Sequence, residues 1–306
     1  MKHTSPTINL LQYLALRVYE MFLHMFPIDV NLGLARVIGN LWYLAMPKHR
    51  KRAGENLRRS FSPEEMSDEE IARVARASCE HFVCLLIEIM FTPRLIRPES
   101  WYRYLRLKNL SEPIRMLLDQ KPVILITGHY GNWELLGFAL AALGFPTNAV
   151  ARAIENPYIN RHLLGIREGS GLRVLDKWGV GKELRSIFDQ GESLAFIADQ
   201  NAGRKGVFVD FFGRKASTYR SVALIAHRWS LPIVVGYARR IGKRFFYEVG
   251  CQEIIRPEDW KGRDDEIVYI TQRFTKAIED FIRVKPEQYL WIHRRWKTRP
   301  PEERAA

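Results

Sequence analysis

From residue 122 onward, short apolar runs alternate with stretches of helical periodicity, and this alternation limits the fold more than any other feature. Strands are predicted over 122–127, 146–151, 172–175, 193–198, 207–212, 232–238 and 244–251, and helices over 133–143, 157–169, 181–190 and 217–230. Such alternation is typical of a largely parallel central sheet flanked by helices. Apolar residues at helical spacing then predict an amphipathic closing helix over 265–283. The sequence therefore predicts an α/β fold.

The N-terminal segment, residues 1–47, is predicted to be helical and to associate with a membrane. Residues 8–26 are mostly apolar and about long enough to span a bilayer, but Arg17, Glu20 and His24 are costly in hydrocarbon. A second apolar stretch, 32–46, contains two aromatic residues and ends in the basic cluster 48–52. That order is typical of a helix lying on anionic lipid. The alternative is a buried helix followed by a solvated basic face.

Residues 48–306 are expected to form the second domain, with a helical lead-in to about residue 120. Ser67 and the acidic residues after it predict a capped helix that runs through Met90 and ends at Pro93 and Pro98.

Composition limits the partners without choosing among them. The 306 residues include 47 Lys and Arg against 34 Asp and Glu, a net charge of +13. The positive electrostatic field of such a chain favours binding to an anionic membrane surface, phosphorylated lipids, an acidic carrier protein or nucleic acid. The three cysteines have no CxxC spacing, so neither a disulfide framework nor a metal site is implied.

The segment from His129 to Glu134, HYGNWE, follows a predicted buried strand and precedes a predicted helix. Gly131 and Asn132 can bend the chain so that the imidazole and the carboxylate converge. A carboxylate at the far ring nitrogen fixes the tautomer and strengthens imidazole as a base. This is a charge-relay arrangement without a serine, in which a substrate hydroxyl could be the missing member.

His129, Arg152 and Asp199 each follow a predicted strand. Sites in parallel sheets gather at the carboxyl ends of the strands, so the three are expected on one rim. The chain has no GxSxG, Walker A or HExxH sequence and no complete dinucleotide fingerprint. Nucleotide hydrolysis, hydride transfer and zinc proteolysis therefore lack support.

Five segments in order resemble the late acyltransferases of lipid A biosynthesis, within the lysophospholipid acyltransferase superfamily. They are GHYGNWE at 128–134, ARAIENP at 151–157, ADQN at 198–201, VDFFGRKAST at 209–218 and QYLWIHRRWKTRP at 288–300. The resemblance covers about residues 10 to 300.

The resemblance implies an O-acyltransferase that moves a fatty acyl group from an acyl-carrier-protein or CoA thioester to a hydroxyl of a lipid A-type glycolipid precursor. It places the reaction at the cytoplasmic face of the inner membrane, with acyl carrier protein as a transient partner and an anionic membrane surface, and with no metal, bound cofactor or nucleic acid. One alternative keeps the chemistry and changes the acceptor to another glycolipid, such as a phosphoinositol mannoside. A second is a non-catalytic peripheral membrane or nucleic-acid-binding protein.

By the same resemblance, His129 is the general base and Glu134 orients it; the alternative is a capping histidine and a carboxylate favoured by a helix dipole. Arg152 binds an acceptor phosphate or the developing oxyanion, unless it is a surface ion-pair residue. Asp199 anchors Arg152 or orders the acceptor site, unless it caps a turn. Gln200 donates a hydrogen bond there.

The resemblance implies further substrate contacts. Asn132 and Arg294 are expected to bind substrate, with Arg294 near a phosphorylated headgroup or phosphopantetheine. Phe211 and Phe212 are expected beside an acyl groove, against a plain core interpretation. Ser217 and Thr218 fit a helix N-cap.

Overall fold

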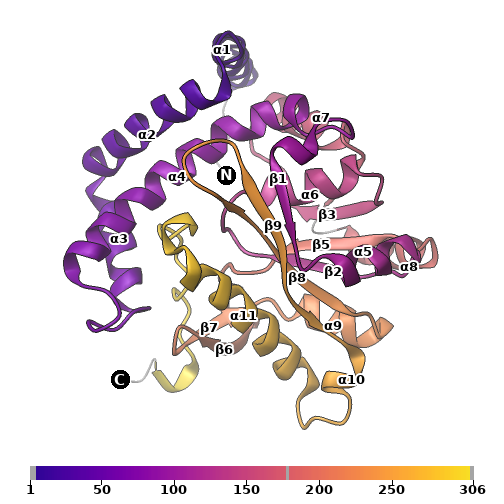
Figure 1. Ribbon diagram of the computed structural model, residues 1–306. Coiled ribbons are helices and arrows are strands. Elements are labelled where there is room, and N and C mark those ends of the chain that lie inside the picture. The colour runs from indigo at the N-terminus through magenta and orange to yellow at the C-terminus, as the bar shows by residue number, and fades with distance from the viewer. Residues whose placement is uncertain (1–4, 177–178, 304–306) are drawn as a thin grey trace.

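The computed structural model describes residues 5–176 and 179–303, and its centre is a seven-stranded sheet (Figure 1). The strand order is β1-β9-β8-β2-β5-β3-β4. All neighbouring strands pair in parallel except β8 and β9, which are antiparallel. This confirms the predicted mostly parallel sheet. The strands are β1 (Leu105–Lys108), β2 (Ile124–Thr127), β3 (Thr147–Ala151), β4 (Leu172–Asp176), β5 (Ser193–Ile197), β8 (Ile233–Arg240) and β9 (Tyr247–Ile255).

The pleat of the central strand β2 divides the core between the two faces of the sheet. Ile124 and Ile126 belong to the cluster that contains Phe274 and Ile278 of the closing helix α11. Val123 and Leu125 pack on the opposite side, with residues of α5. Helices therefore cover both faces, as expected for buried parallel strands. The helices after β1 are α5 (Ser111–Leu118), α6 (Trp133–Ala142), α7 (Pro157–Glu168), α8 (Leu184–Asp189), α9 (Ser221–Trp229), α10 (Pro257–Trp260) and α11 (Glu266–Val284).

In the described part of the chain, the α-helices that precede the sheet are α1 (Pro6–His24), α2 (Ile28–Ala45), α3 (Pro47–Arg58) and α4 (Asp68–Leu95). The predicted capping box at the start of α4 is present, with Ser67 and Glu70 bonding each other's backbone N–H. The predicted end at Pro93 is wrong, because the proline lies inside the last turn and the helix continues to Leu95. In Figure 1, α2 lies along α4. A Cβ on Gly39 would lie 2.5 Å from the Cα of Glu80, so this close approach of the two helices requires glycine.

Helices α1 and α2 expose most of the large apolar side chains that lie at the surface of the described chain, including Leu11, Val18, Met21 and Leu41. None of the described helices is both long enough and apolar enough to cross a bilayer. The predicted association of residues 1–47 with a membrane surface stays a prediction.

The segment 207–218 differs from its prediction. Strand β6 (Val207–Phe211) pairs with β7 (Arg214–Thr218) in a separate antiparallel hairpin rather than joining the central sheet. Phe212 and Gly213 form its two-residue turn, both with positive φ, which suits the twist of a hairpin. Ser217 and Thr218 lie in β7 and do not cap a helix, since α9 begins at Ser221.

Candidate active site

His129 lies just beyond the carboxyl end of β2, and Asp199 just beyond the end of the adjacent strand β5. The Nδ1–H of His129 donates to Asp199 Oδ1 over 2.7 Å, and its backbone N–H donates to Asp199 Oδ2 over 2.9 Å. The Asp199 side chain is 2% exposed and that of His129 16%. One buried carboxylate thus fixes both the backbone and the ring of the histidine.

The other ring nitrogen of His129 is left as an acceptor. With the proton on Nδ1, Nε2 carries the lone pair, and the side-chain amide of Gln200 donates to it over 3.1 Å. The indole of Trp133 meets the imidazole edge-on, with ring centroids 4.9 Å apart. Nε2 is therefore the atom of His129 that can accept a proton.

The pair is electrostatically coupled. Burial by itself would lower the pKa of His129, but the charge and hydrogen bond of Asp199, with a contribution from Glu134, raise it above its ordinary value. Burial would raise the pKa of Asp199, yet His129 holds it well below its usual range. Asp199 is therefore ionised at neutral pH, and it stabilises the imidazolium that forms when His129 takes up a proton.

Glu134 has a different partner from the one its spacing suggests. Its carboxylate accepts two hydrogen bonds from Arg167 of α7, 2.7 and 2.9 Å long, in a bidentate pair. Among the described residues, Asp199 and not Glu134 is the carboxylate hydrogen-bonded to His129 Nδ1. The expected contact between His129 and Glu134 is therefore wrong for the described structure, where Glu134 bonds Arg167. The chemical roles of His129 and Glu134 remain proposals.

Arg152 follows β3, which pairs with β5, so the ends of β2, β5 and β3 lie side by side. The predicted common rim of His129, Asp199 and Arg152 is therefore present in the sheet. Arg152 is solvent-exposed. Asp199 contacts His129 rather than the expected Arg152.

The other predicted substrate contacts have different positions in the fold. Asn132 is completely buried, and both ends of its amide bond the protein itself. Phe211 and Phe212 belong to the aromatic core with Trp291, and neither lines the apolar cavity described next. Both phenylalanines are therefore core residues, and the expected acyl groove beside them stays a prediction. Arg294 is exposed, at the C-terminal segment.

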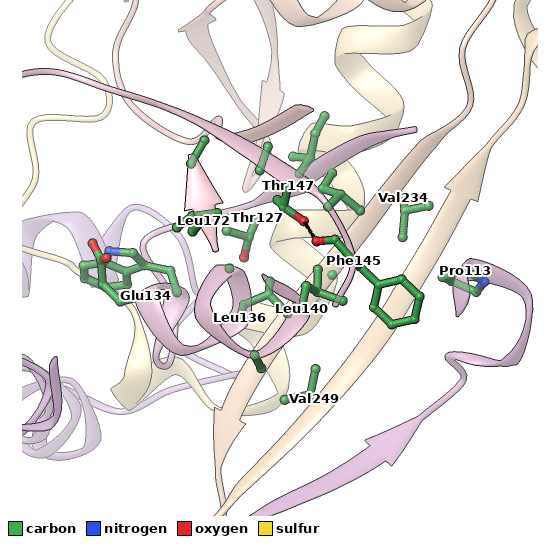
Figure 2. A pocket seen from close by; sticks show the side chains of 18 of the residues that line it. Pro113, Thr127, Glu134, Leu136, Leu140, Phe145, Thr147, Leu172, Val234 and Val249 are labelled. Carbon is green, nitrogen blue, oxygen red and sulfur yellow. Dashed lines mark hydrogen bonds between the residues drawn. The ribbon is translucent and has the colours of Figure 1, made fainter. Parts of the chain in front are cut away.

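A cavity of about 150 Å³ with almost entirely apolar walls lies between the sheet and helices α5 and α6. Trp133, Glu134 and Arg167 line it, so it adjoins His129 through the Trp133 ring. Figure 2 shows Glu134 at one end and Phe145 and Pro113 at the other. The wall between them consists of aliphatic side chains from α6 and from the strands, such as Leu136, Leu140, Leu172, Val234 and Val249.

Two arginines near the site were not predicted. Arg167 holds Glu134, and Arg295, which is 1% exposed, donates from Nη1 to the carbonyl of Ser217 over 2.6 Å and from Nη2 to the hydroxyl of Thr218 over 2.6 Å. Arg295 thereby ties the C-terminal segment to β7. Within residues 5–176 and 179–303 no group of three or more His, Cys, Asp or Glu side chains could hold a metal ion.

Comparison with known proteins places this architecture in a family. The model of the bacterial lipid A biosynthesis acyltransferases matches residues 1–298. The lipid A biosynthesis lauroyltransferase of Escherichia coli K12 is 28% identical over 283 residues, covering 90% of this chain and 87% of that protein. The E. coli palmitoleoyltransferase is 30% identical over 214 residues, covering 68% and 65%. A lipid A biosynthesis acyltransferase of Shigella flexneri gives the same values. The chain belongs to the bacterial lipid A biosynthesis acyltransferase family.

Proposed function

We propose that this protein transfers a fatty acyl group from a thioester donor to a hydroxyl of a lipid A-type glycolipid precursor, with His129 as the general base. The observation that carries the proposal is the buried Asp199–His129 pair, which leaves Nε2 as an acceptor beside an apolar cavity. Family membership supports the reaction class and the acceptor class.

In the proposed reaction, the acceptor hydroxyl replaces Gln200 as the hydrogen-bond donor to His129 Nε2. Its oxygen forms a bond to the thioester carbonyl carbon while Nε2 takes the proton. The tetrahedral intermediate then collapses, the carbon–sulfur bond breaks, and the thiolate leaves with the proton returned by the imidazolium. Asp199 holds the ring and balances its transient charge. General-base assistance of this kind contributes about 10²–10⁴-fold.

The apolar cavity is proposed to hold the acyl chain. Its walls are aliphatic, and it begins beside the Glu134–Arg167 pair, next to the proposed base. An acyl chain that enters from this side leaves its carbonyl near His129. Exposed Arg152, at the same rim, is proposed to bind an acceptor phosphate or the developing oxyanion, since a guanidinium provides a fixed cationic fork.

The donor is proposed to be acyl carrier protein, which docks transiently, or CoA as an alternative. The net charge of +13 favours an acidic donor and an anionic bilayer. The exposed apolar side chains of α1 and α2 are followed by exposed Lys48, Arg50 and Lys51 in α3, which suits attachment to an anionic membrane surface. The proposed location is the cytoplasmic face of the inner membrane. No metal or bound cofactor takes part, and nucleic acid is not a proposed partner.

The test is an acyl-transfer assay with purified protein in lipid vesicles, an acyl-carrier-protein or CoA thioester, and a lipid A precursor. A product heavier by one acyl chain is expected from wild type and from His227→Ala, an exposed histidine of α9, but not from His129→Ala. A His129→Ala variant as fast as wild type would refute the mechanism. Acyl transfer to a phosphoinositol mannoside but not to the lipid A precursor would refute the proposed acceptor class. Vesicle binding without any acyl transfer would support the non-catalytic alternative.

A further inference from the structure

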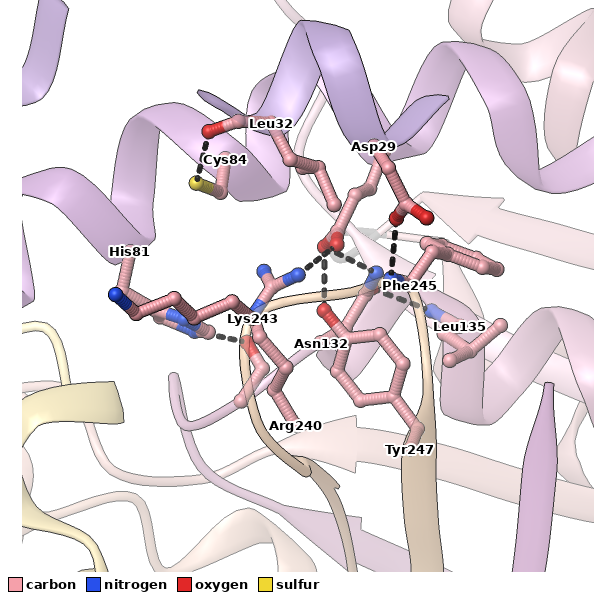
Figure 3. A network of polar contacts seen from close by, with 12 residues as sticks. Asp29, Leu32, His81, Cys84, Asn132, Leu135, Arg240, Lys243, Phe245 and Tyr247 are labelled. Atoms are coloured by element: carbon pink, nitrogen blue, oxygen red, sulfur yellow. Dashed lines mark hydrogen bonds and ion pairs between the residues drawn. The ribbon is translucent and has the colours of Figure 1, made fainter. Parts of the chain in front are cut away.

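A buried ion pair lies behind the turn that carries His129, and the proposed reaction does not use it. Glu88 of α4 is 0% exposed and Arg240 of β8 is 6% exposed, and the Arg240 Nη1 pairs with Glu88 Oε1. The hydroxyl of Tyr247 in β9 donates to Glu88 Oε2 over 2.5 Å. Figure 3 shows Arg240, Tyr247 and Asn132 close together between α4 and the hairpin of β8 and β9, and all three bond the carboxylate of Glu88. Burying two charges has a large desolvation cost, so the net stabilisation from such a pair is small.

The pair reaches the catalytic turn through Asn132. The Asn132 Nδ2–H donates to Glu88 Oε2 over 3.1 Å, while its Oδ1 accepts the N–H of Leu135 over 2.8 Å and caps α6. Its own backbone N–H donates to the carbonyl of Ala238 over 2.8 Å. One side chain therefore links α4 to the start of α6, three residues after His129.

A second contact from α4 holds the same turn. The ring of His81 is buried, and its Nε2 hydrogen-bonds the carbonyl of Gly131 over 3.0 Å. Gly131 has φ +57°, and a Cβ there would lie 1.8 Å from the carbonyl oxygen of Ala238. The turn is thus pressed against β8, and any movement of it disturbs the buried contacts.

On its opposite side, the turn makes the contacts that fix His129. The carbonyl of His129 accepts the N–H of Leu290 over 3.1 Å, and its N–H and ring both bond Asp199. The position of the ring against Asp199 depends on the backbone of this short turn. A turn held from one side only would let the imidazole move away from its carboxylate.

We infer that Glu88, Asn132 and Tyr247 are positioning residues, which hold the His129 turn in register with Asp199 through one buried polar cluster. The inference rests on the proposed general-base function of His129, and it assigns Asn132 this role in place of the substrate contact suggested by its motif. Displacing a reacting group by about 1 Å can lower the rate by about 10²-fold, so a modest loosening is measurable.

Two variants test the inference without leaving a buried charge unpaired. Asn132→Ser keeps an oxygen to cap α6 but loses the amide that reaches Glu88. Tyr247→Phe removes only the hydroxyl bonded to Glu88. For Asn132→Ser we expect kcat to fall about 10–100-fold while KM changes less than about threefold. Tyr247→Phe should show a smaller loss of the same kind. In both, the acid limb of the pH profile of kcat should move to lower pH, because the influence of Asp199 on His129 weakens.

The matched control is Glu80→Gln, which removes a partly exposed pair of α4, Arg76–Glu80, whose Glu80 bonds Arg76 and not the turn. It should leave kcat and the pH profile unchanged. Wild-type kcat and an unshifted acid limb in both folded variants would overturn the inference, as would an equal loss in the control. If Asn132→Ser does not fold, Tyr247→Phe decides.

An activity-independent measurement separates this inference from the function itself. NMR titration of the His129 ring, assigned with His129→Ala, should give a lower midpoint in Asn132→Ser than in wild type. Absent turnover by wild type would count against the proposed function, whereas an unchanged midpoint in the variants would count against the positioning role.

Discussion

Two carboxylates lie near His129, and their hydrogen-bond partners separate their roles. Asp199 bonds the ring and the backbone of the histidine, whereas both oxygens of Glu134 bond Arg167. The charge of Glu134 still raises the pKa of His129 from a distance. We therefore assign orientation of the base to Asp199 and propose that Glu134 and Arg167 act as one unit at the cavity entrance.

If Glu134 and Arg167 act as one unit, the effects of substituting them on kcat/KM should not be additive. Glu134→Gln and Arg167→Ala should each lower kcat/KM, and the double variant should be little worse than either. A coupling energy within about 0.5–3 kcal/mol is expected from the double-mutant cycle on initial rates. The same cycle on the exposed Arg173–Glu183 pair is the control. Strictly additive losses for Glu134 and Arg167 would show that the two residues act separately.

At the scale of elements, α6 forms one wall of the apolar cavity and also carries Trp133 and Glu134 at its start. The same helix therefore connects the proposed base to the proposed acyl chain. Each buried methylene contributes only about 0.8 kcal/mol, about a fourfold effect, so a closed end is needed for sharp selection of chain length.

Changing the far end of the cavity should change acyl-chain length preference. Leu140→Phe reduces the space midway along it and should favour shorter chains, whereas Phe145→Ala at the far end should favour longer ones. Competition assays with donors of different chain length, read by product mass, measure the shift. Leu224→Phe, an exposed leucine of α9, should have the wild-type preference. Unchanged preference in both cavity variants would place the acyl chain elsewhere.

The first two helices combine an exposed apolar surface with the basic start of α3. Replacing Leu11, Val18 and Met21 of α1 by Ser should weaken binding to anionic vesicles, because that apolar area no longer enters the lipid. Vesicle co-sedimentation at several salt concentrations measures the effect. Replacing exposed Leu118 and Val284, on α5 and α11, is the matched control. Equal binding by the α1 variant and the control would contradict the proposed attachment surface.

At the scale of the whole molecule, alternating apolar patterns predicted most of the central sheet, because buried parallel strands are continuously apolar. Strand β1 was missed, since three of its four residues are exposed and two of them, Arg106 and Lys108, are charged. The hairpin of β6 and β7 was misassigned, because its turn depends on positive φ at Phe212, which no composition rule favours.

The sequence predicted which residues lie at the site better than it predicted their hydrogen-bond partners. Strand ends brought His129, Asp199 and Arg152 to one rim, but local spacing suggested Glu134 as the partner of His129. The actual partner, Asp199, lies 70 residues away, and the Arg167 that pairs with Glu134 lies 33 residues away. Such long-range pairs follow from strand order, which the sequence pattern does not specify.

The buried histidine of α4 makes global stability depend on pH. Burial, followed by the charge of Arg240, lowers the pKa of His81 from 6.5 to about 3. The unfolded chain therefore takes up a proton that the folded chain excludes, and stability is lost as the pH falls from about 6.5 towards 3. Urea unfolding at several pH values should show a weaker dependence for His81→Gln than for wild type. Identical slopes would contradict this assignment, and His227→Gln is the control.

The pH profile of kcat for Asp199→Asn tests the central claim most directly. His129 must be neutral to take a proton, so the wild-type rate should fall as the pH drops through the pKa of His129, which lies above its ordinary value. In Asp199→Asn the plateau should fall by about 10²-fold or more, and the acid limb should move to lower pH, because the carboxylate that raises this pKa is gone. A folded variant with the wild-type plateau and acid limb would show that Asp199 does not orient the base.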